Sequence, residues 1–404
     1  MRILVVQETD WLDRNPILHH RMLEDLSARG HQILVIDFEI LWAQRQHRGL
    51  RQLRRVKPDV VRWGGPAGVQ LVRPGMLRLP LLDRVSWLIG NARELRRLER
   101  EWRPDVVVAY GISNAWLAQR WARRLGIPFV HHIMDALHTL AEPPALARLA
   151  RLVEAAVLRR ADHVLPVNNG LGDYVRDMGA PADRVTVLPM GVDHAPPAAD
   201  GAAVREQLGI GPDAVVLLFM GWLYHFSGLL PLADAIERRA ADLPGVVLLV
   251  VGDGDVLEEL RARSARQGLT GRLLVTGRRP ATEMAGLIAA SDLCLLPADD
   301  NPTMRYIVPA KVIEYMQAGR PVLATPLPGL KAEFGDPPGL LWVRTPDELL
   351  DVVMGLGEND GARQARAREL GRSVQALMAA RPDWTAVTDR FELVLSSTRP
   401  GRPV

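Results

Sequence analysis

The chain has 404 residues, of which 48% are apolar and 24% are charged, and its formal net charge at pH 7 is +3. This length and apolar content predict two folded domains, because single cores stop growing beyond about 250–300 residues. The single cysteine, Cys294, excludes an internal disulfide and a cysteine-based metal site, and we expect it to be a buried, inert thiol in a strand.

Short apolar runs alternate with helical patterns along the first half of the chain. The runs that we expect to form buried strands span residues 3–6, 33–37, 59–62, 105–109, 128–132, 163–167 and 184–188. The segment HHRMLEDLSARG ends at Gly30, as helices commonly do. Alternating strands and helices predict an α/β fold with a parallel sheet covered by helices on both faces.

A second α/β series follows a break in this pattern. Pro, Ala and Gly dominate around GVDHAPPAADGAA, so residues 193–213 are predicted to link an N-terminal domain, 1–192, to a C-terminal domain, 214–375. The later strands are expected at 215–220, 246–251, 273–276, 293–296 and 321–324. Residues 376–404 are expected to form a C-terminal helix, with a return to the N-terminal domain as one option.

No segment has the length of a membrane span. The first apolar run, MRILVV, is too short for a signal peptide, and no later run approaches ~18 apolar residues. We therefore expect a cytoplasmic protein, with membrane association on that side as one option. Aromatic content is 5% and no nucleic-acid recognition motif is present, so nucleic acid is not an expected partner.

Arginine-rich segments give the first half a basic character. Residues 71–103 alternate apolar side chains with many arginines, and clusters at 45–57 and 120–124 extend the pattern. A basic amphipathic surface can bind an anionic membrane, which would suit a lipid-linked ligand. The simpler and stronger interpretation is an arginine-rich helix that packs its apolar face on the sheet.

Three expected strands of the second half end in glycine-containing turns. Gly221 and Gly228 bracket the loop in FMGWLYHFSG, Gly252 lies in VVGDGD, and VTGRR contains Arg278. Glycines at the carboxyl ends of parallel strands let backbone N–H groups approach a phosphate, so we expect a nucleotide site at this rim. Each glycine alone is also compatible with ordinary turn chemistry. Neither a G-x-G-x-x-G dinucleotide motif nor a Walker motif is present.

Lys311, one of only three lysines in the chain, lies on the first turn of the helix predicted after the loop 301–309. A cation there opposes the helix dipole, which is favourable mainly when an anion lies between the two. The same segment carries Arg305 and Glu314 and turns at Gly319 into the strand 321–324. The sequence therefore predicts a phosphorylated ligand at this helix N-terminus.

The chain resembles the retaining GT-B glycosyltransferases of family four, also called glycosyl transferases group 1. Three segments carry the resemblance, which extends over nearly the whole chain: DHVLPVNNGLGDYVRDMGAPADRVTVLPMGVD (162–193), LLVVGDGDVLEELRARSARQGLTGRLLVTGRRPATEMAGLIAASDLCLLP (248–297) and PAKVIEYMQAGRPVLAT (309–325). The resemblance implies two Rossmann-like domains whose parallel sheets face each other across a cleft. It also implies a nucleotide-diphosphate sugar as co-substrate, with no other cofactor and no metal.

The resemblance also implies roles for individual residues of the second half. Glu314 would bind the ribose hydroxyls, Lys311 and Arg305 would bind the diphosphate, and Arg278 and Asp253 would lie near the base and the sugar. The simpler interpretations are a helix pair between Lys311 and Glu314 and a solvated loop cation at Arg305. The full set expected to bind the donor is Gly221, Ser227, Gly228, Gly252, Asp253, Arg278, Asp299, Asn301, Arg305, Tyr306, Lys311 and Glu314.

The sequence departs from the family pattern at three of these places. Family members often carry an Arg and a Lys where this chain has Trp222 and Ser227, and a Glu where it has Tyr306. Two phosphate-binding cations are therefore missing, unless Lys311 and Arg305 replace them. Asp299 and Asn301 are candidate replacements for the missing Glu.

The strand and turn PFVHHIMDALH supply the candidate catalytic residues His132, Asp135 and His138. Alternation along the strand places His131 and His132 on opposite faces, and the family's histidine position can instead fall on Met134. A structural role at the strand end is the competing interpretation for each histidine.

The function that the resemblance implies is retaining transfer of a sugar to an acceptor hydroxyl, for which a lipid-linked or envelope glycan is one option. The alternatives are a GT-B nucleotide-sugar epimerase and a non-catalytic nucleotide-sugar-binding protein. The missing loop cations favour the binding protein.

Overall fold

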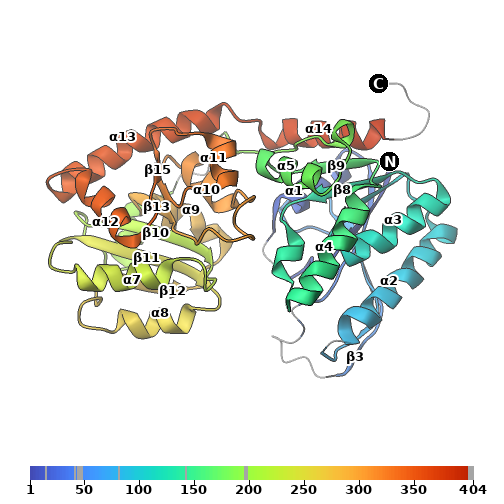
Figure 1. Ribbon diagram of the computed structural model, residues 1–404, viewed down its shortest axis with the longest axis horizontal. Helices are drawn as coiled ribbons and strands as arrows, with labels where there is room; N and C mark the ends of the chain where they lie inside the picture. Colours follow the sequence, from blue (N-terminus) through green and yellow to red (C-terminus); the bar gives the residue numbers. More distant parts are fainter. Residues whose placement is uncertain are drawn as a thin grey trace. The chain divides into compact units, whose positions relative to one another are not determined.

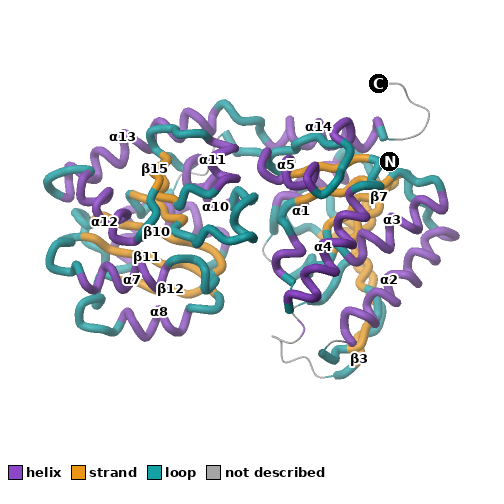
Figure 2. The backbone as a smooth tube through the Cα atoms, viewed as in Figure 1, coloured by secondary structure: helices purple, strands orange, loops and turns teal. Residues whose placement is uncertain are grey.

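The structure, a computed structural model, describes residues 1–13, 16–40, 42, 49–80, 82–141, 143–194 and 199–398. The chain divides into two compact units. The first comprises Met1–Gly191 and the chain from Trp384 onward, and the second comprises Val192–Asp383. Each unit contains a parallel sheet accompanied by helices, so the predicted α/β fold with two Rossmann-like halves is confirmed (Figures 1 and 2).

The first unit is built on a seven-stranded sheet in the order β4-β5-β2-β1-β7-β8-β9. Its strands are β1 (Arg2–Gln7), β2 (Gln32–Ile36), β4 (Arg55–Val60), β5 (Val69–Arg73), β7 (Val106–Tyr110), β8 (Phe129–Ile133) and β9 (His163–Pro166), and a small ribbon joins β3 (Arg51–Gln52) to β6 (Met76–Leu77). All strands of the sheet pair in parallel except β4, which is antiparallel to β5. Numbered along the chain without β4, the order is 3-2-1-4-5-6, so the topological switch point lies between β1 and β7.

Two groups of helices accompany this sheet. The helix α1 (Leu18–Ala28) packs against α14 (Trp384–Ser397), and their core includes Trp11, Met22, Leu23 and Phe391. The helices α2 (Leu82–Glu101), α3 (Ser113–Leu125) and α4 (Pro144–Leu158) contact one another in series, and α5 (Asn169–Asp177) follows β9. The C-terminal helix expected within 376–404 is therefore α14 of the first unit, and residues 399–404 lie outside the described residues.

The predicted strands of the first unit need three corrections. Residues 59–62 do not form a buried parallel strand, because this stretch belongs to the exposed, antiparallel edge strand β4 and its turn. Residues 184–188 form no strand; they lie beside β9, with the Thr186 N–H donating to the Val164 carbonyl at 3.1 Å. The basic segment 71–103 contains part of the unpredicted strand β5 as well as the helix α2. The predicted basic cluster 45–57 begins outside the described residues.

The second unit has a six-stranded sheet in the order β12-β11-β10-β13-β14-β15, and every pair is parallel. The strands are β10 (Val215–Trp222), β11 (Val246–Asp253), β12 (Leu273–Gly277), β13 (Leu293–Leu296), β14 (Val322–Ala324) and β15 (Leu340–Trp342). The helices are α6 (Gly201–Gln207), α7 (Leu229–Arg238), α8 (Leu257–Ser264), α9 (Met284–Ala289), α10 (Ala310–Gln317), α11 (Pro328–Phe334), α12 (Pro346–Gly355) and α13 (Asp360–Ala379). The order is again 3-2-1-4-5-6, with its switch point between β10 and β13.

Part of the expected linker 193–213 is folded. The helix α6 is capped by the Asp200 side chain and packs on α9, and Arg205 forms an ion pair with Asp292 at 2.7 Å. This stretch therefore belongs to the second unit, and residues 195–198 of the expected linker lie outside the described residues. Cys294 lies fully buried in β13, as predicted, and its burial raises the pKa of the thiol to about 12. No helix in the described ranges combines the length and apolarity of a membrane span.

A buried charge network fastens the carboxyl ends of β2 and β5 to the loop after β1. The Arg73 guanidinium donates to Asp37 at 2.5 Å and to Asp10 at 2.7 Å, and both carboxylates are fully buried. Burial and the neighbouring Asp10 raise the pKa of Asp37 to about 6, while Arg73 opposes this shift. The positive charge of Arg73 thus stabilises two carboxylates that are buried side by side.

Replacing Arg73 with methionine should lower the free energy of unfolding of the first unit by about 3–5 kcal/mol, because two buried carboxylates lose their counter-ion. Urea unfolding at pH 7 measures this loss. The matched control is Arg97→Met, whose pair with Glu101 is exposed and should contribute less than about 0.5 kcal/mol. A loss of similar size in both variants would contradict the assigned role of the network.

Candidate functional site

Near their carboxyl ends, the strands β10 and β11 place two glycines in contact with each other. Gly221 and Gly252 are paired in register, and their φ angles are +126° and +149°. A Cβ atom placed on Gly252 would lie 1.8 Å from the Gly221 carbonyl oxygen, so only glycine allows this approach. The end of the sheet therefore presents bare backbone, as the glycine-containing turns predicted.

The loop after β10 is attached to the end of β13, at the switch point of the second sheet. Gly228 begins α7 with φ +73°, and a Cβ there would lie 1.9 Å from the Pro297 carbonyl oxygen. The Asp299 N–H donates to the Phe226 carbonyl at 2.9 Å. Ser227 is only 4% exposed, and its hydroxyl has no hydrogen-bond partner among the described residues. Backbone contacts thus fix this loop, which contains no lysine or arginine; its His225 lies 3.7 Å from Asp255.

Lys311 reaches the same rim from the first turn of α10. Its Nζ lies 3.8 Å from the centroid of the Phe219 ring, and a Cβ on Gly221 would come within 3.0 Å of it. Burial lowers the pKa of Lys311 to about 7, although Glu314 on the next turn acts to raise it. The described residues place no carboxylate in ion-pair contact with this amine. A desolvated cation beside bare backbone is the arrangement expected where an anion binds.

Glu314 lies one turn after Lys311 on α10. Its own pKa is raised by desolvation, and the charge of Lys311 acts in the opposite direction. Part of its side chain still reaches solvent, and a carboxylate there can accept hydrogen bonds from a ligand. The structure therefore brings four of the predicted residues together: Gly221, Gly252, Lys311 and Glu314.

The loop between β13 and α10 uses part of the predicted set for its own geometry. Asn301 Oδ1 accepts the N–H groups of Thr303 and Met304 at 2.9 and 3.0 Å, so this side chain builds a turn. The Arg305 guanidinium is half-exposed and lies 3.2 Å from Asp300, and its carbonyl accepts the Gly329 N–H at 2.7 Å. The half-buried Tyr306 follows directly. Arg305 is thus a surface cation that is already paired with Asp300 of the same loop.

Two predicted residues lie farther along the rim, at the ends of β11 and β12. Asp253 is paired with Trp222, and its Oδ1 accepts the Gly254 N–H at 2.8 Å. Arg278 is exposed directly after β12. Both residues therefore lie at the same edge of the sheet as Gly221 and Gly252.

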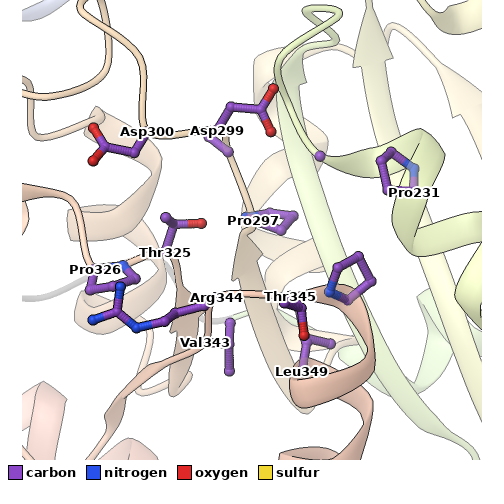
Figure 3. A pocket seen from close by; sticks show the side chains of 13 residues that line it. Pro231, Pro297, Asp299, Asp300, Thr325, Pro326, Val343, Arg344, Thr345 and Leu349 are labelled. Carbon is purple, nitrogen blue, oxygen red and sulfur yellow. The ribbon is translucent and has the colours of Figure 1, made fainter.

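A cavity of about 380 Å³ opens at the ends of β13, β14 and β15, beside the N-termini of α7 and α12 (Figure 3). Of the predicted residues, Gly228 and Asp299 line it. Sequence reasoning missed Thr325, Arg344 and Thr345, which also line it. Thr325 follows a predicted strand, so it could have been found from the rule that ligands bind at the carboxyl ends of parallel strands. Arg344 could not, because it follows β15, which was not predicted. Lys311 and Glu314 do not line this cavity, so it adjoins the predicted phosphate site without containing it.

The two adjacent histidines of the first unit lie inside its core. His132 is 1% exposed, its Nδ1 lies 3.0 Å from the Tyr110 hydroxyl, and burial lowers its pKa to about 3. His131 is fully buried and donates from Nε2 to the Gly111 carbonyl at 3.0 Å, and burial lowers its pKa to about 4. Both rings are therefore neutral at pH 7 and enclosed by protein.

His138, the other candidate histidine, is half-buried. His138 is on the 3₁₀ turn η2 (Leu137–Leu140), three residues after the part-buried Asp135, at the carboxyl end of β8. Its Nδ1 lies 2.9 Å from Glu154 Oε2 and 3.0 Å from the Tyr174 hydroxyl, and 15% of its side chain is exposed. Sequence reasoning missed Glu154, although a lone carboxylate in the apolar helix PALARLARLVEAAVL was a usable signal.

Two family descriptions match the chain, one in each unit. "Glycosyl transferase 4-like domain" matches residues 19–191, and "Glycosyl transferases group 1" matches residues 214–359.

Curated relatives cover most of the chain. A 2-deoxystreptamine N-acetyl-D-glucosaminyltransferase of Streptomyces fradiae is 27% identical over 383 residues, which are 87% of this chain and 89% of that protein. A D-inositol 3-phosphate glycosyltransferase of Xylanimonas cellulosilytica is 30% identical over 304 residues, which are 69% of each chain.

Solved structures show the same fold at low identity. Anabaena HepE in complex with UDP matches with a TM-score of 0.73 at 19% identity, over 98% of this chain and 100% of that one. Sucrose-phosphate synthase of Thermosynechococcus elongatus matches with a TM-score of 0.75 at 16% identity, over 98% and 99%.

Lys311→Met should raise the free energy of unfolding of the second unit at pH 6–7 by about 2 kcal/mol, because the buried amine disfavours folding when it is charged. Between pH 7 and its ordinary value of 10.5, the unfolded chain holds a proton that the folded chain has released, so wild-type stability rises with pH. The advantage of the methionine variant should therefore shrink toward pH 10, as urea unfolding at several pH values would show. A constant difference across this range would contradict the desolvated lysine.

Proposed function

This chain belongs to family four of the glycosyltransferases, the glycosyl transferases group 1, and from that premise we propose that it is a retaining enzyme that moves a sugar from a uridine diphosphate donor to an acceptor hydroxyl. The observation that carries the proposal is Lys311, a half-buried lysine whose desolvated amine lies against the bare backbone at Gly221 and has no carboxylate in ion-pair contact in the described part of the chain. A diphosphate would supply the missing negative charge. A uracil base is supported by HepE, which is of this fold and was solved with UDP and with UDP-glucose.

The residues of α10 would divide the work on the donor. Lys311 would stabilise the charge that develops on the diphosphate as the bond to the anomeric carbon breaks. Glu314 would accept two hydrogen bonds from the ribose hydroxyls, since an exposed carboxylate on the next helical turn can bind adjacent hydroxyls. Arg305 would add a second cation after exchanging Asp300 for phosphate. Arg278 and Asp253 would contact the base and the sugar, and retention of configuration is supported by the resemblance to retaining members of the family.

The acceptor in this proposal is a polyhydroxylated six-membered ring. Three curated relatives match this chain over most of their own length. Their names describe transfer to 2-deoxystreptamine or to D-inositol 3-phosphate. Both names describe cyclitol rings with several hydroxyl groups. The first unit would hold the acceptor at the carboxyl end of its sheet, where open α/β sheets bind their ligands.

A lipid-linked acceptor is the second candidate, and one surface favours it. The exposed side of α2 carries Val85 and Ile89, which are 55% and 48% exposed, and then Arg93, Arg96 and Arg100. Apolar side chains beside arginines are the pattern of helices that bind anionic membranes.

Lys311→Ala should weaken UDP binding by about 1–3 kcal/mol, because a charge-assisted contact with phosphate is lost. Binding should also take up protons above pH 7, since phosphate favours the charged amine, and the affinity should fall as the pH rises from 7 toward 9. Isothermal titration calorimetry measures both effects. Lys331→Ala is the matched control, because that lysine pairs with the exposed Asp336. Unchanged UDP affinity in the Lys311 variant would refute the assigned phosphate site.

The donor base is tested first by thermal unfolding with UDP, GDP, ADP, CDP and dTDP. A nucleotide at a hundred times its Kd adds about 2.7 kcal/mol to the stability. A shift with UDP alone supports the proposal, and a shift with another base corrects the donor. No shift with any nucleotide would mean that the cations missing at Trp222 and Ser227 are not replaced, and it would contradict the proposed donor site. Turnover of the bound donor then separates an enzyme from a binding protein, and NMR of the product anomer tests retention.

The two acceptor candidates differ in membrane binding. For a lipid-linked acceptor, the protein should co-sediment with phosphatidylglycerol vesicles but not with phosphatidylcholine vesicles. The triple variant Arg93→Gln, Arg96→Gln, Arg100→Gln should then bind about 100-fold more weakly, at ~1 kcal/mol per arginine. Absence of vesicle binding by the wild type would leave the soluble cyclitol as the acceptor class to pursue.

A further inference from the structure

The cavity at the ends of β13, β14 and β15 lies outside the part of the rim that Lys311 and Glu314 form, because neither residue lines it. Its volume of about 380 Å³ falls within the range of about 300–1,000 Å³ that is usual for sites that bind small molecules. All of its lining residues belong to the second unit. The cavity is therefore a candidate site in its own right, and its lining indicates what it can bind.

The walls of the cavity are fixed and partly apolar. At Gly228 the start of α7 touches the end of β13, since a Cβ there would lie 1.9 Å from the Pro297 carbonyl oxygen. The buried side chains of Val343 and Leu349 contribute to the lining. Rigid proline rings add more apolar surface, from Pro231, Pro297, Pro326 and Pro346. These surfaces can be covered by the C–H face of a ring-shaped ligand.

Opposite charges line the cavity without pairing. Asp299 and Asp300 follow β13 and Arg344 follows β15, and Figure 3 shows the two aspartates on one side and Arg344 on the other. Asp300 already pairs with Arg305 at 3.2 Å. Within the described ranges, the side chains of Asp299 and Arg344 form no ion pair, either with each other or with another residue. The cavity thus keeps a strong acceptor and a strong donor apart.

Two threonines add groups that can both donate and accept. Thr325 follows β14, and Thr345 is the N-cap of α12, where its Oγ1 accepts the Glu348 N–H at 3.1 Å. A hydroxyl group has one hydrogen to donate and two lone pairs, so Thr345 can still donate. The cavity therefore offers acceptors after β13, donors after β15 and hydroxyl groups of both kinds.

This lining disfavours a simple ion. A phosphate would be attracted by Arg344 but repelled by the two aspartates, and an ammonium group would meet the reverse. An alcohol hydroxyl suits both sides, because it donates to a carboxylate and accepts from a guanidinium.

We propose that the cavity binds a neutral polyhydroxylated ring, a monosaccharide or a cyclitol, whose hydroxyl groups donate to Asp299 and accept from Arg344 while its C–H face covers the prolines. The inference rests on the lining of the cavity and stands whether or not the donor is a uridine diphosphate sugar. Such a ring can come from two sources with the same chemistry, as a free molecule or as the sugar carried by a nucleotide.

Saturation-transfer difference NMR with myo-inositol and with glucose tests the site on the full chain. Both rings should bind to the wild type. Arg344→Met and Asp299→Ala should each weaken this binding about 10-fold, because each removes a hydrogen bond to a charged group. The matched control is Arg366→Met, which removes an exposed arginine that pairs with Glu369 and does not line the cavity, and it should bind the rings as the wild type does.

Three results of this test would overturn the proposal. The first is a wild type that binds neither ring. The second is equal weakening in Arg344→Met and Arg366→Met, because the ring would then bind elsewhere. The third is tighter binding of inorganic phosphate, which supplies acceptors alone, or of alanine, whose two opposite charges could pair with Arg344 and Asp299 directly.

Competition then identifies the source of the ring. Displacement of bound myo-inositol by UDP-glucose but not by UDP would assign the cavity to the sugar of the donor. Retention of myo-inositol with either nucleotide would assign it to a free ring. Displacement by UDP itself would make the cavity part of the nucleotide site and overturn the proposal. A protein that binds no UDP would refute the proposed donor, whereas ring binding that Arg344→Met weakens would still stand.

Discussion

The close approach of Gly221 to Gly252 is the constraint from which the proposed donor site follows. Two parallel strands that end in register can bring their backbones this near only without side chains, since a Cβ would lie 1.8 Å from the opposing oxygen. The space above them is then open to Lys311, which any side chain at Gly221 would obstruct. The amine consequently lies over an aromatic ring and polar backbone, desolvated and without a carboxylate partner in the described chain. The desolvated amine lowers the free energy of unfolding, as is common for charged groups that a fold holds in position for a ligand.

The first unit treats its buried charges in the opposite way. Arg73 pairs with both Asp10 and Asp37 inside the protein, and desolvation keeps His131 and His132 neutral. The charged groups at this end of the sheet are therefore buried and paired within the unit. A residue of this unit that binds a ligand must therefore lie beside these buried groups, where its side chain is held in place but still reaches solvent.

The sequence predicted the second unit better than the first, for physical reasons. Its central strands are buried on both faces and read as continuous apolar runs, and the turns after them require glycine. Lys311 was recognisable because lysine is rare in this chain and its place on a helix is electrostatically unfavourable. The strand predicted at 59–62 was wrong because β4 is an exposed, antiparallel edge strand, and β15 was not predicted because its three residues are too few to show a periodic pattern. The cavity beside Arg344 and the contact of Glu154 with His138 depend on residues that only tertiary packing brings together, and Asn301 uses its side chain for a turn that its spacing does not reveal.

The chain enters and leaves the second unit at neighbouring points. Val192 and Asp383 form a bridge, and the Val192 N–H donates to the Pro382 carbonyl at 3.2 Å, while Gly191 contacts Trp384 within the first unit. The second unit is thus an insertion into the first. The first and last residues of the insertion, Val192 and Asp383, are neighbours, and so are Gly191 and Trp384, the residues of the first unit that flank it. Such a connection lets each unit be exchanged as a cassette: Val192–Asp383 can be cut out whole, and Gly191 can be joined to Trp384 with a short bridge. Both cuts fall outside the strands and helices of each unit, so neither hydrophobic core would be interrupted by them.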